Sequence, residues 1–491
     1  MPIVCLEFHL ENFLTLFKDW IVPMGKIQDQ IFQIFCGANA SNTLFKQGSL
    51  FMDYQESFFW AERHALKLKI AGIIENEKIA VIGQNCPETL LWTIANGINS
   101  CSTLLINPNT NQSTIELILE RLNVNHIILN NQIQTRYSSK NKPQLENVFS
   151  ELDRPFISIL SSGTTGIGKI INHSFRTIFG GAKSFSNQWG LDAESRVFHN
   201  WPMSYMAGYF NLFLCPLWSG AEIVIGEQYS NKTVFSLCDD LIKSDCTDAI
   251  LSPTMAQSLI RRQRNERRSD LKKKRIISTS SILYPTVAKE FYRIFGVDMR
   301  PCYGITEYGG SFTLGATSID RELSVGRAIP EVELSEKDGE LYVKSPFVAP
   351  SVIVGLGEEF YQNSMSFYRT DDLGYIGSDG EIYLTGRQSE NIKKGGEFIS
   401  LIEIENIALR VLDIDDVIAI PERSEFWGED YLLKVVRPIK TKETPNDDTG
   451  PIIEELLKHM PRKYLPSKIQ FVEKIQRTNS GKPLRRFYLE S

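Results

Sequence analysis

A run of hydroxyl and glycine residues that closes on a lysine is the strongest chemical signal in this sequence. Residues 161–169 read SSGTTGIGK and follow the apolar run 157–160, which predicts a buried strand. Glycines let backbone N–H groups turn inward, hydroxyls add donors and Lys169 adds charge, so the loop suits a polyphosphate. The candidate phosphate ligands in this loop are Ser161, Ser162, Gly163, Thr164, Thr165, Gly166 and Lys169.

Two phosphate-binding patterns compete for this loop. Residues 163–169 match G-x-x-x-x-G-K, the Walker A pattern of P-loop kinases and ATPases. That pattern continues with Ser or Thr to hold Mg²⁺, whereas Ile170 has no hydroxyl. The other pattern is S-S-G-T-T-G-x-x-K, and motifs elsewhere in the chain decide between the two.

A second motif, YGITE at residues 303–307, brings a hydroxyl and a carboxylate together. Such a pair is a hard oxygen site suited to Mg²⁺ on phosphates. With the loop at 161–169, it makes the chain resemble the adenylate-forming enzymes: acyl-CoA synthetases, aryl-CoA ligases, luciferases and peptide-synthetase adenylation domains. The resemblance implies that Thr306 touches phosphate, Glu307 holds Mg²⁺ and Tyr303 stacks on adenine.

The motifs appear in the family's order, and the third concerns the ribose. Residues 368–374 read YRTDDLG and resemble Y-R-T-G-D-L-G, which implies that Asp372 accepts hydrogen bonds from both ribose hydroxyls. Asp371 replaces the family's glycine, so either aspartate could be the ligand, and Asp372 is favoured. Residues 386–405 resemble the family's G-R-x-x-D-x-I-K motif, which implies that Arg387 contacts ribose and phosphate.

The C-terminal hundred residues carry the parts that the family moves. The resemblance places Ser389 at the hinge, and Gly395 and Gly396 along the approach of the thiol. Residues 477–485 read RTNSGKPLR and resemble R-T-x-x-G-K-x-x-R, so Lys482 is the candidate catalytic lysine. The catalytic set implied by the resemblance is Lys482, Thr164, Glu307 and Arg387.

The segment that would hold the acid departs from the family. P-x-x-H-x-x-G is PMSYMAG at residues 202–208, with Tyr205 at the His or aromatic position. Peptide-synthetase domains place an Asp nearby to hold an α-ammonium, whereas Tyr205 carries no charge at pH 7, which argues against a simple α-amino acid. The mix of small and apolar groups suits an aryl or modest acyl group. The pocket candidates are Tyr205, Met206, Ala207, Gly304, Gly309 and Gly310.

Two further segments are unusual. The family's G-G-A-P-L adenine loop is TSSIL at residues 279–283, so Ser280 and Ser281 would alter one wall of the nucleotide site, where Gly304 is also expected. Residues 261–275 contain nine Lys or Arg. This basic segment is interpreted either as a solvated surface or as a docking patch for an acidic carrier protein or for the phosphates of CoA.

Alternating strand and helix patterns must position these motifs. Strands are predicted at 79–83, 102–106 and 126–129, with helices from Pro87 to about 98 and from a Ser113–Glu116 capping box to about 122. This alternation predicts right-handed βαβ units and a parallel sheet. Antiparallel strands are predicted at 339–344 and 381–385, and an α+β unit in the last hundred residues.

The predicted fold is α/β, with a large multi-sheet N-terminal domain and a small mobile α+β C-terminal domain. The predicted boundary divides residues 1–386 from residues 387–491. The chain has 491 residues, more than one core usually serves. Its 53 Lys and Arg against 59 Asp and Glu give a net charge of −6, so general nucleic-acid binding is not expected.

The composition also indicates the cellular compartment. The eight cysteines are dispersed and lack C-x-x-C spacing, which argues against a zinc knuckle or a dithiol site and fits free thiols. The N-terminus lacks a basic start, and no run of 18 apolar residues exists, so neither a signal peptide nor a membrane span is expected. The expected localisation is cytoplasmic.

The resemblance implies an ATP- and Mg²⁺-dependent ligase. It joins a small carboxylic acid to AMP and passes the acyl group to a thiol, either CoA or the phosphopantetheine of an acyl or aryl carrier protein. The alternatives are an inactive binding protein with the same fold, an amino-acid-activating ligase and a P-loop kinase. The altered loop at residues 279–283 favours the inactive protein, whereas retention of Lys482, Glu307, Asp372 and Arg387 argues against it.

Overall fold

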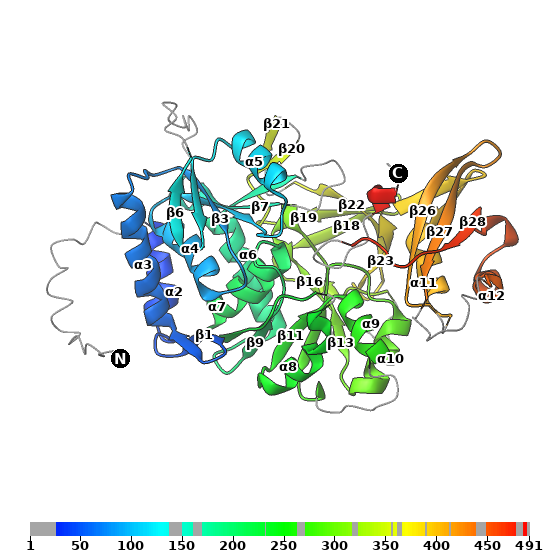
Figure 1. The fold of residues 1–491 in the computed structure, drawn as a ribbon, viewed down its shortest axis with the longest axis horizontal. Helices are drawn as coiled ribbons and strands as arrows, with labels where there is room; N and C mark the ends of the chain where they lie inside the picture. The colour runs from blue at the N-terminus through cyan, green and yellow to red at the C-terminus, as the bar shows by residue number, and fades with distance from the viewer. Residues whose placement is uncertain are drawn as a thin grey trace.

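The structure is a computed structural model. It describes residues 26–136, 150–160, 169–230, 232–262, 271–316, 323–354, 357–360, 366–387, 390–411, 414–437, 448–477 and 485–488. Figure 1 shows the chain running from helices at the N-terminal end, through two large sheets, to a separate sheet at the opposite end.

The first large sheet contains the strands on either side of the phosphate loop. Its order is β21-β20-β8-β7-β4-β3-β5-β6, and β7, β4, β3 and β5 run parallel. β8 returns antiparallel to β7, so residues 161–169 connect two adjacent strands. The strands are β3 (Lys78–Ile82), β4 (Ser102–Ile106), β5 (His126–Leu129), β6 (Gln132–Thr135), β7 (Pro155–Leu160), β8 (Ile170–Ser174), β20 (Ser351–Val354) and β21 (Gly357–Phe360).

Helices cover both faces of this sheet, which confirms the predicted βαβ units. α4 packs on one face of β3 and β4 and also contacts α2 and α3, while α5 covers the other face of the sheet. The predicted Ser113–Glu116 capping box is wrong, because Asn111 caps α5 by accepting from the Thr114 N–H at 2.8 Å. The helices are α2 (Lys26–Cys36), α3 (Tyr54–Ile70), α4 (Pro87–Ile98), α5 (Gln112–Arg121) and α6 (Phe175–Trp189).

The second large sheet has the order β13-β12-β11-β9-β10-β1-β2 and is parallel except for the β1–β2 pair. Its strands are β1 (Thr43–Gln47), β2 (Leu50–Asp53), β9 (Arg196–His199), β10 (Glu222–Ile225), β11 (Asp248–Leu251), β12 (Arg275–Ser278) and β13 (Met299–Pro301). A π-helix, η3 (Ala207–Leu214), follows β9 and packs against α6. The α-helices in this part of the chain are α7 (Cys215–Ser219), α8 (Leu237–Lys243), α9 (Pro253–Arg262) and α10 (Pro285–Phe295).

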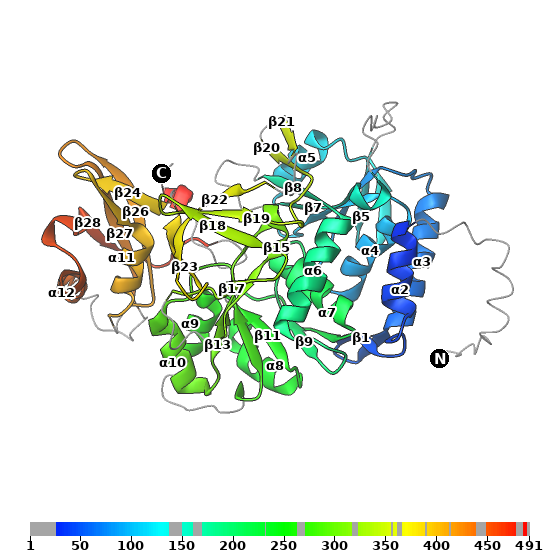
Figure 2. The same ribbon diagram turned by 180° about the vertical axis from the view of Figure 1, so that it is seen from behind.

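Antiparallel strands follow, as predicted for this region. β18-β19-β22-β23 form one sheet, and two short pairs precede it. Figure 2 shows this sheet between α6 and the C-terminal strands. The strands are β14 (Gly304–Ile305), β15 (Gly310–Ser311), β16 (Thr313–Leu314), β17 (Arg327–Ala328), β18 (Glu333–Lys337), β19 (Glu340–Lys344), β22 (Tyr368–Ile376) and β23 (Ile382–Arg387).

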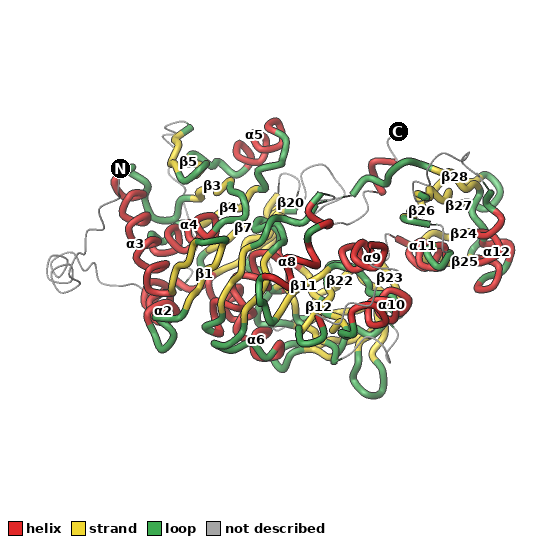
Figure 3. Tube along the Cα trace, turned by 60° about the horizontal axis from the view of Figure 1, so that its bottom comes forward, coloured by secondary structure: helices red, strands yellow, loops and turns green. Residues whose placement is uncertain are grey.

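The C-terminal residues form a sheet with its own hydrophobic cluster around Leu401, Tyr431 and Leu456. Figure 3 shows this sheet and its two helices at one end of the molecule. The α/β class with an α+β C-terminal unit is thus confirmed. The elements are β24 (Asn391–Lys394), β25 (Glu397–Ser400), α11 (Leu401–Ala408), β26 (Asp416–Ser424), β27 (Gly428–Val436), α12 (Gly450–His459) and β28 (Lys468–Phe471).

Candidate active site

The carboxylate of Asp372 is the centre of the best-defined polar cluster. Asp372 on β22 lies directly opposite Arg387 on β23, and the Arg387 Nε donates to Asp372 Oδ1 at 2.5 Å. The Tyr303 hydroxyl donates to Asp372 Oδ2 at 2.7 Å. Antiparallel pairing therefore brings Asp372 and Arg387 together, and a side-chain hydrogen bond adds Tyr303, so three side chains that the sequence assigned to the nucleotide meet here.

Electrostatics keep Tyr303 and Arg387 of this cluster protonated at neutral pH. Burial and then the neighbouring Asp372 charge raise the pKa of Tyr303 well above its usual value, so its hydroxyl remains a donor at neutral pH. Burial alone would lower the pKa of Arg387, but the charge of Asp372 raises it overall. A carboxylate fixed by one cation and one phenol is pre-oriented to accept from a diol.

The two adjacent aspartates lie in different environments. The side chain of Asp372 is 6% exposed, whereas that of Asp371 is 68% exposed and lies 3.5 Å from Arg369. Asp371 has φ +61°, in the left-handed region that the family fills with glycine. The backbone thus keeps the shape of the motif despite the substitution, and the geometry favours Asp372 as the ribose ligand.

The predicted phosphate cation and the predicted metal carboxylate also meet. Lys169 Nζ lies 3.3 Å from Glu307 Oε1, with Lys169 46% exposed and Glu307 15% exposed. Mg²⁺ on nucleotides is usually held by one or two carboxylates plus phosphate oxygens and water. A single carboxylate, Glu307, beside the half-exposed Lys169 fits that requirement. The described residues contain no cluster of three or more metal-ligating side chains.

His173 connects these two segments and was not predicted from the sequence. It lies on β8, four residues after Lys169, and its Nε2 bonds the Thr306 carbonyl oxygen at 2.7 Å. Burial lowers the pKa of His173 to about 4, so the ring is neutral at pH 7, with Nε2 as donor and Nδ1 as acceptor from Thr177. No strand was predicted directly after residue 169, so nothing in the sequence pattern pointed to His173.

The altered adenine loop keeps a strained backbone. Ser280 has φ +81°, and its hydroxyl lies 3.4 Å from the Tyr205 hydroxyl. The Tyr205 ring stacks on Trp201 with centroids 5.8 Å apart. Ser281 is exposed to solvent. The loop therefore brings Ser280 to the predicted acid pocket.

The remaining pocket candidates lie together. Gly304 pairs with Ser311 across the β14–β15 ribbon, so Gly310 and Gly304 are neighbours. Met206 directly precedes η3, which begins at Ala207. A Cβ on Gly309 would lie 2.5 Å from the Cβ of Phe347, which leaves no room for a side chain there.

Several predicted site residues lie outside the described residues, and their roles stay predictions. They are Ser161, Ser162, Gly163, Thr164, Thr165, Gly166, Ser389 and Lys482. Gly395 and Gly396 are described, and they form the turn between β24 and β25. The Gly395 N–H donates to the Trp427 carbonyl oxygen at 2.9 Å.

The C-terminal sheet contacts the large unit next to the adenine loop. The Tyr284 hydroxyl donates to the Ile402 carbonyl oxygen at 3.0 Å, and Arg261 lies 3.7 Å from Asp415. These contacts place the first turn of α11 beside residues 279–284.

The described ends of the basic segment serve internal contacts. Arg275 pairs with the fully buried Asp248 at 2.7 Å, and the Lys274 ammonium donates to the Cys246 carbonyl oxygen. Arg262 lies over the Phe235 ring. Lys272 and Lys273 are exposed, and residues 263–270 lie outside the described residues, so a docking role for the segment stays a prediction.

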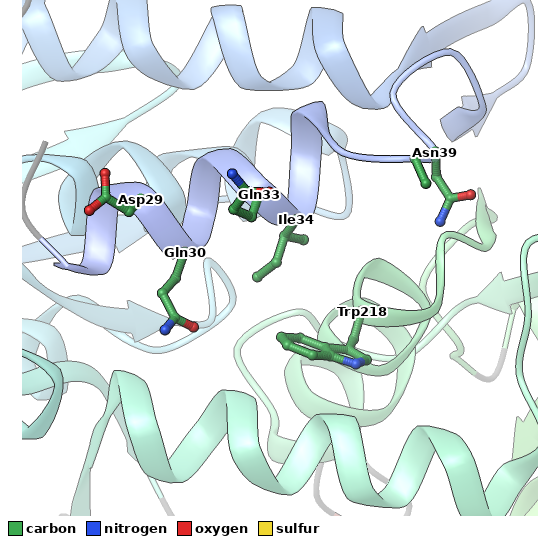
Figure 4. A pocket seen from close by; sticks show the side chains of 7 residues that line it. Asp29, Gln30, Gln33, Ile34, Asn39 and Trp218 are labelled. Carbon is green, nitrogen blue, oxygen red and sulfur yellow. The ribbon is translucent and has the colours of Figure 1, made fainter.

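A separate hollow of about 460 Å³ lies between α2 and α7 (Figure 4). Trp218 forms one side, and Asp29, Gln30 and Gln33 on α2 form the other. It shares no residue with the Asp372 cluster or the Lys169–Glu307 pair.

In the described part of the chain, no helix is both long enough and apolar enough to cross a membrane.

Comparison with known proteins identifies the family. Residues 39–351, more than half of the chain, match the AMP-binding enzyme family. The chain belongs to that family.

Among curated relatives, indoleacetate–CoA ligase from Aromatoleum aromaticum is 27% identical over 342 residues, which cover 67% of this chain and 65% of that ligase. Malonate–CoA ligase from Arabidopsis thaliana is 25% identical over 368 residues, which cover 67% of this chain and 60% of that ligase. The chain thus spans less than two thirds of the length of these two relatives.

Solved structures match the fold over nearly the whole chain. The crystal structure of the anthranilate CoA ligase AuaEII in complex with anthranoyl-AMP has a TM-score of 0.81 at 18% identity. The match covers 96% of this chain and 97% of that one. The two chains therefore share one fold over nearly their whole matched length.

Proposed function

We propose that this protein activates a carboxylic acid with ATP and then transfers the acyl group to a thiol. The observation that carries the proposal is the Asp372 carboxylate, held by Tyr303 and Arg387 as an acceptor for the ribose diol. The Lys169–Glu307 pair supports it, since it supplies a cation and a metal carboxylate for the phosphates. Membership of the AMP-binding family supports the choice of nucleotide.

The first step is an in-line substitution at the α-phosphorus. A carboxylate oxygen of the acid forms a bond to phosphorus, the bond to the β-phosphate oxygen breaks, and pyrophosphate leaves with its electron pair. Bound Mg²⁺ would neutralise charge on the phosphate oxygens. Lys169, and Lys482 by resemblance, would stabilise negative charge that grows between acid and phosphate, and such preorganised charge is usually the largest catalytic contribution.

The second step forms a thioester. The thiol sulfur attacks the acyl carbon, and AMP leaves with the oxygen that came from the acid. CoA is the preferred acceptor, because both curated relatives described above are CoA ligases. A carrier-protein phosphopantetheine remains the alternative acceptor in this proposal.

The proposal includes a rotation between the two steps. Residues 387–491 would pivot about Ser389, withdrawing Lys482 and bringing Gly395 and Gly396 to the thiol. The positive φ of both glycines, +59° and +89°, supports a turn that a bulky side chain would strain. The separate hydrophobic cluster of the C-terminal sheet supports its movement as one body.

The test measures nucleotide products with a panel of carboxylic acids. The ligase predicts AMP and pyrophosphate in equal amounts, dependent on acid and Mg²⁺. ADP, with the γ-phosphoryl group transferred to an acceptor, would instead indicate a P-loop kinase. ATP binding without acid-dependent pyrophosphate release across the panel would support the inactive protein, which the substituted adenine loop at Ser280 favours.

A further inference from the structure

Two apolar side chains pack against Gly310, one of the residues predicted to line the acid pocket. A Cβ placed on Gly310 would lie 3.1 Å from Met206 Cε and 2.9 Å from Phe210 Cδ1. Met206 is 6% exposed and Phe210 is 0% exposed. The glycine that could open a pocket between β15 and η3 is therefore covered by two large apolar side chains.

Phe210 is fixed in this position from several sides. A Cβ on Gly181 of α6 would lie 3.3 Å from the Phe210 ring, and the Phe185 ring centroid lies 6.3 Å from that of Phe210. The π-helical geometry of η3 sets where residues 206 and 210 project. Phe210 therefore forms a rigid floor, whereas unbranched Met206 can adjust.

The named pocket candidates offer a hydroxyl group and no charged side chain. None of the six pocket candidates or Phe210 carries a charge at neutral pH. The Tyr205 hydroxyl lies 3.4 Å from the Ser280 hydroxyl of the altered adenine loop. A second carboxylate or a sulfonate on the substrate would lose its hydration here without a cation from these residues, which is strongly unfavourable.

We propose that the acid is a short monocarboxylic acid with an uncharged tail, and that Met206 and Phe210 set its length. The inference rests on the proposed function and names the substrate class of the same site. It departs from the wider expectation of an aryl or modest acyl group. It also separates this protein from relatives named for indoleacetate, which is larger, and for malonate, which has a second charge.

The first test compares pyrophosphate release with acetate, propanoate, butanoate, hexanoate, benzoate, indoleacetate and malonate. The wild-type protein should prefer acids of two to four carbons, with kcat/KM at least about tenfold lower for hexanoate, benzoate and malonate. Met206→Ala should raise kcat/KM for hexanoate about tenfold, since it removes a side chain worth two to three methylenes of contact. Met255→Ala is the matched control, because Met255 is also fully buried but lies on α9.

A binding measurement separates failure of this inference from failure of the proposed function. Sulfamoyl adenosines carrying propanoyl or benzoyl groups mimic the acyl adenylate and need no turnover. We expect the wild-type protein to bind the propanoyl compound more tightly than the benzoyl compound. Met206→Ala should reduce this difference in affinity. Equal or tighter binding of the benzoyl compound by the wild-type protein would overturn the inference and leave the ligase intact. No binding of either compound would overturn both.

Discussion

Asp371 and Asp372 are chemically identical neighbours with opposite surroundings. Only Asp372 is buried against Tyr303 and Arg387. Asp372→Asn should raise the KM for ATP by ~10- to 100-fold, since hydrogen bonds to a charged group contribute ~1.5–3 kcal/mol. Asp371→Asn is the matched control and should change that KM less than twofold. A larger effect at Asp371 than at Asp372 would reassign the ribose ligand.

Ser280 occupies a conformation that side chains with a Cβ rarely adopt. At φ +81°, this backbone costs on the order of 1–2 kcal/mol for a residue other than glycine. Ser280→Gly should therefore raise the free energy of unfolding by about 0.5–1 kcal/mol, after allowing for the greater unfolded-state entropy of glycine. Urea unfolding would measure this change.

The neighbouring serine provides the control for that measurement. Ser281 is not among the described residues with positive φ, so Ser281→Gly should lower the free energy of unfolding by a similar amount. A loss of stability in Ser280→Gly equal to that in Ser281→Gly would contradict a strained loop.

The sequence shows residue types but not the environments that distinguish neighbouring residues of one type. The motif containing Asp372 predicted a carboxylate for the ribose, but sequence alone left Asp371 open. Burial separates the two, and burial follows from β22–β23 pairing, which joins residues 15 apart in sequence. The left-handed backbone at Ser280 and Asp371 was not predicted either, because the sequence shows that glycine is replaced there but not whether the backbone keeps its conformation.

At the scale of elements, β8 is held to the turn η6 (Thr306–Tyr308) by His173. Loss of that bond should let Glu307 move. His173→Leu should therefore raise the Mg²⁺ concentration needed for half-maximal activity by about three- to tenfold, because one hydrogen bond contributes ~1 kcal/mol. His173→Gln can still donate to the Thr306 carbonyl and should keep most of the Mg²⁺ affinity. Equal Mg²⁺ dependence in both variants would contradict this positioning role.

Element boundaries were predictable where the chain marks them. The helix opened by Pro87 ends at Ile98, and the strand at residues 102–106 has the expected limits. The cap of α5 was misassigned because Asn111 and Ser113 are both good N-caps only two residues apart. The π-helix η3 was missed, since a uniformly apolar segment has no periodicity that distinguishes π from α.

At the scale of the whole molecule, two buried imidazoles link stability to pH. Burial lowers the pKa of both His173 and His199 to about 4, against about 6.5 in an unfolded chain. Below pH 6.5 the unfolded state binds more protons than the folded state, so stability is full above pH 6.5 and falls toward pH 4. Each histidine contributes a slope of up to about 1.4 kcal/mol per pH unit in that window.

His173→Gln isolates one of these contributions. Its free energy of unfolding should fall less steeply than that of the wild-type protein between pH 6.5 and pH 4.5, so the difference between the two proteins shrinks as pH falls. Urea unfolding at three or four pH values measures it. Parallel curves would show that His173 is not held neutral by burial.

The overall plan was predictable because its signals are local. Strand and helix alternation predicted a parallel sheet, and the patterns at residues 339–344 and 381–385 predicted antiparallel strands. The placement of the C-terminal sheet was not predictable, since it depends on contacts such as Tyr284 with Ile402, which are 118 residues apart. Lys482, which the resemblance implies is the catalytic lysine, lies outside the described residues, so its place in the site stays a prediction.

The central claim is attack of the acid on the α-phosphorus, and isotope transfer tests it most directly. The accepted acid is labelled with ¹⁸O in both carboxylate oxygens and incubated with ATP, Mg²⁺ and CoA. Mass spectrometry of the nucleotide should find AMP carrying one ¹⁸O atom, because the bridging oxygen of the acyl adenylate comes from the acid and leaves with AMP. Unlabelled AMP, or label in inorganic phosphate with ADP as the nucleotide product, would contradict acyl adenylate formation.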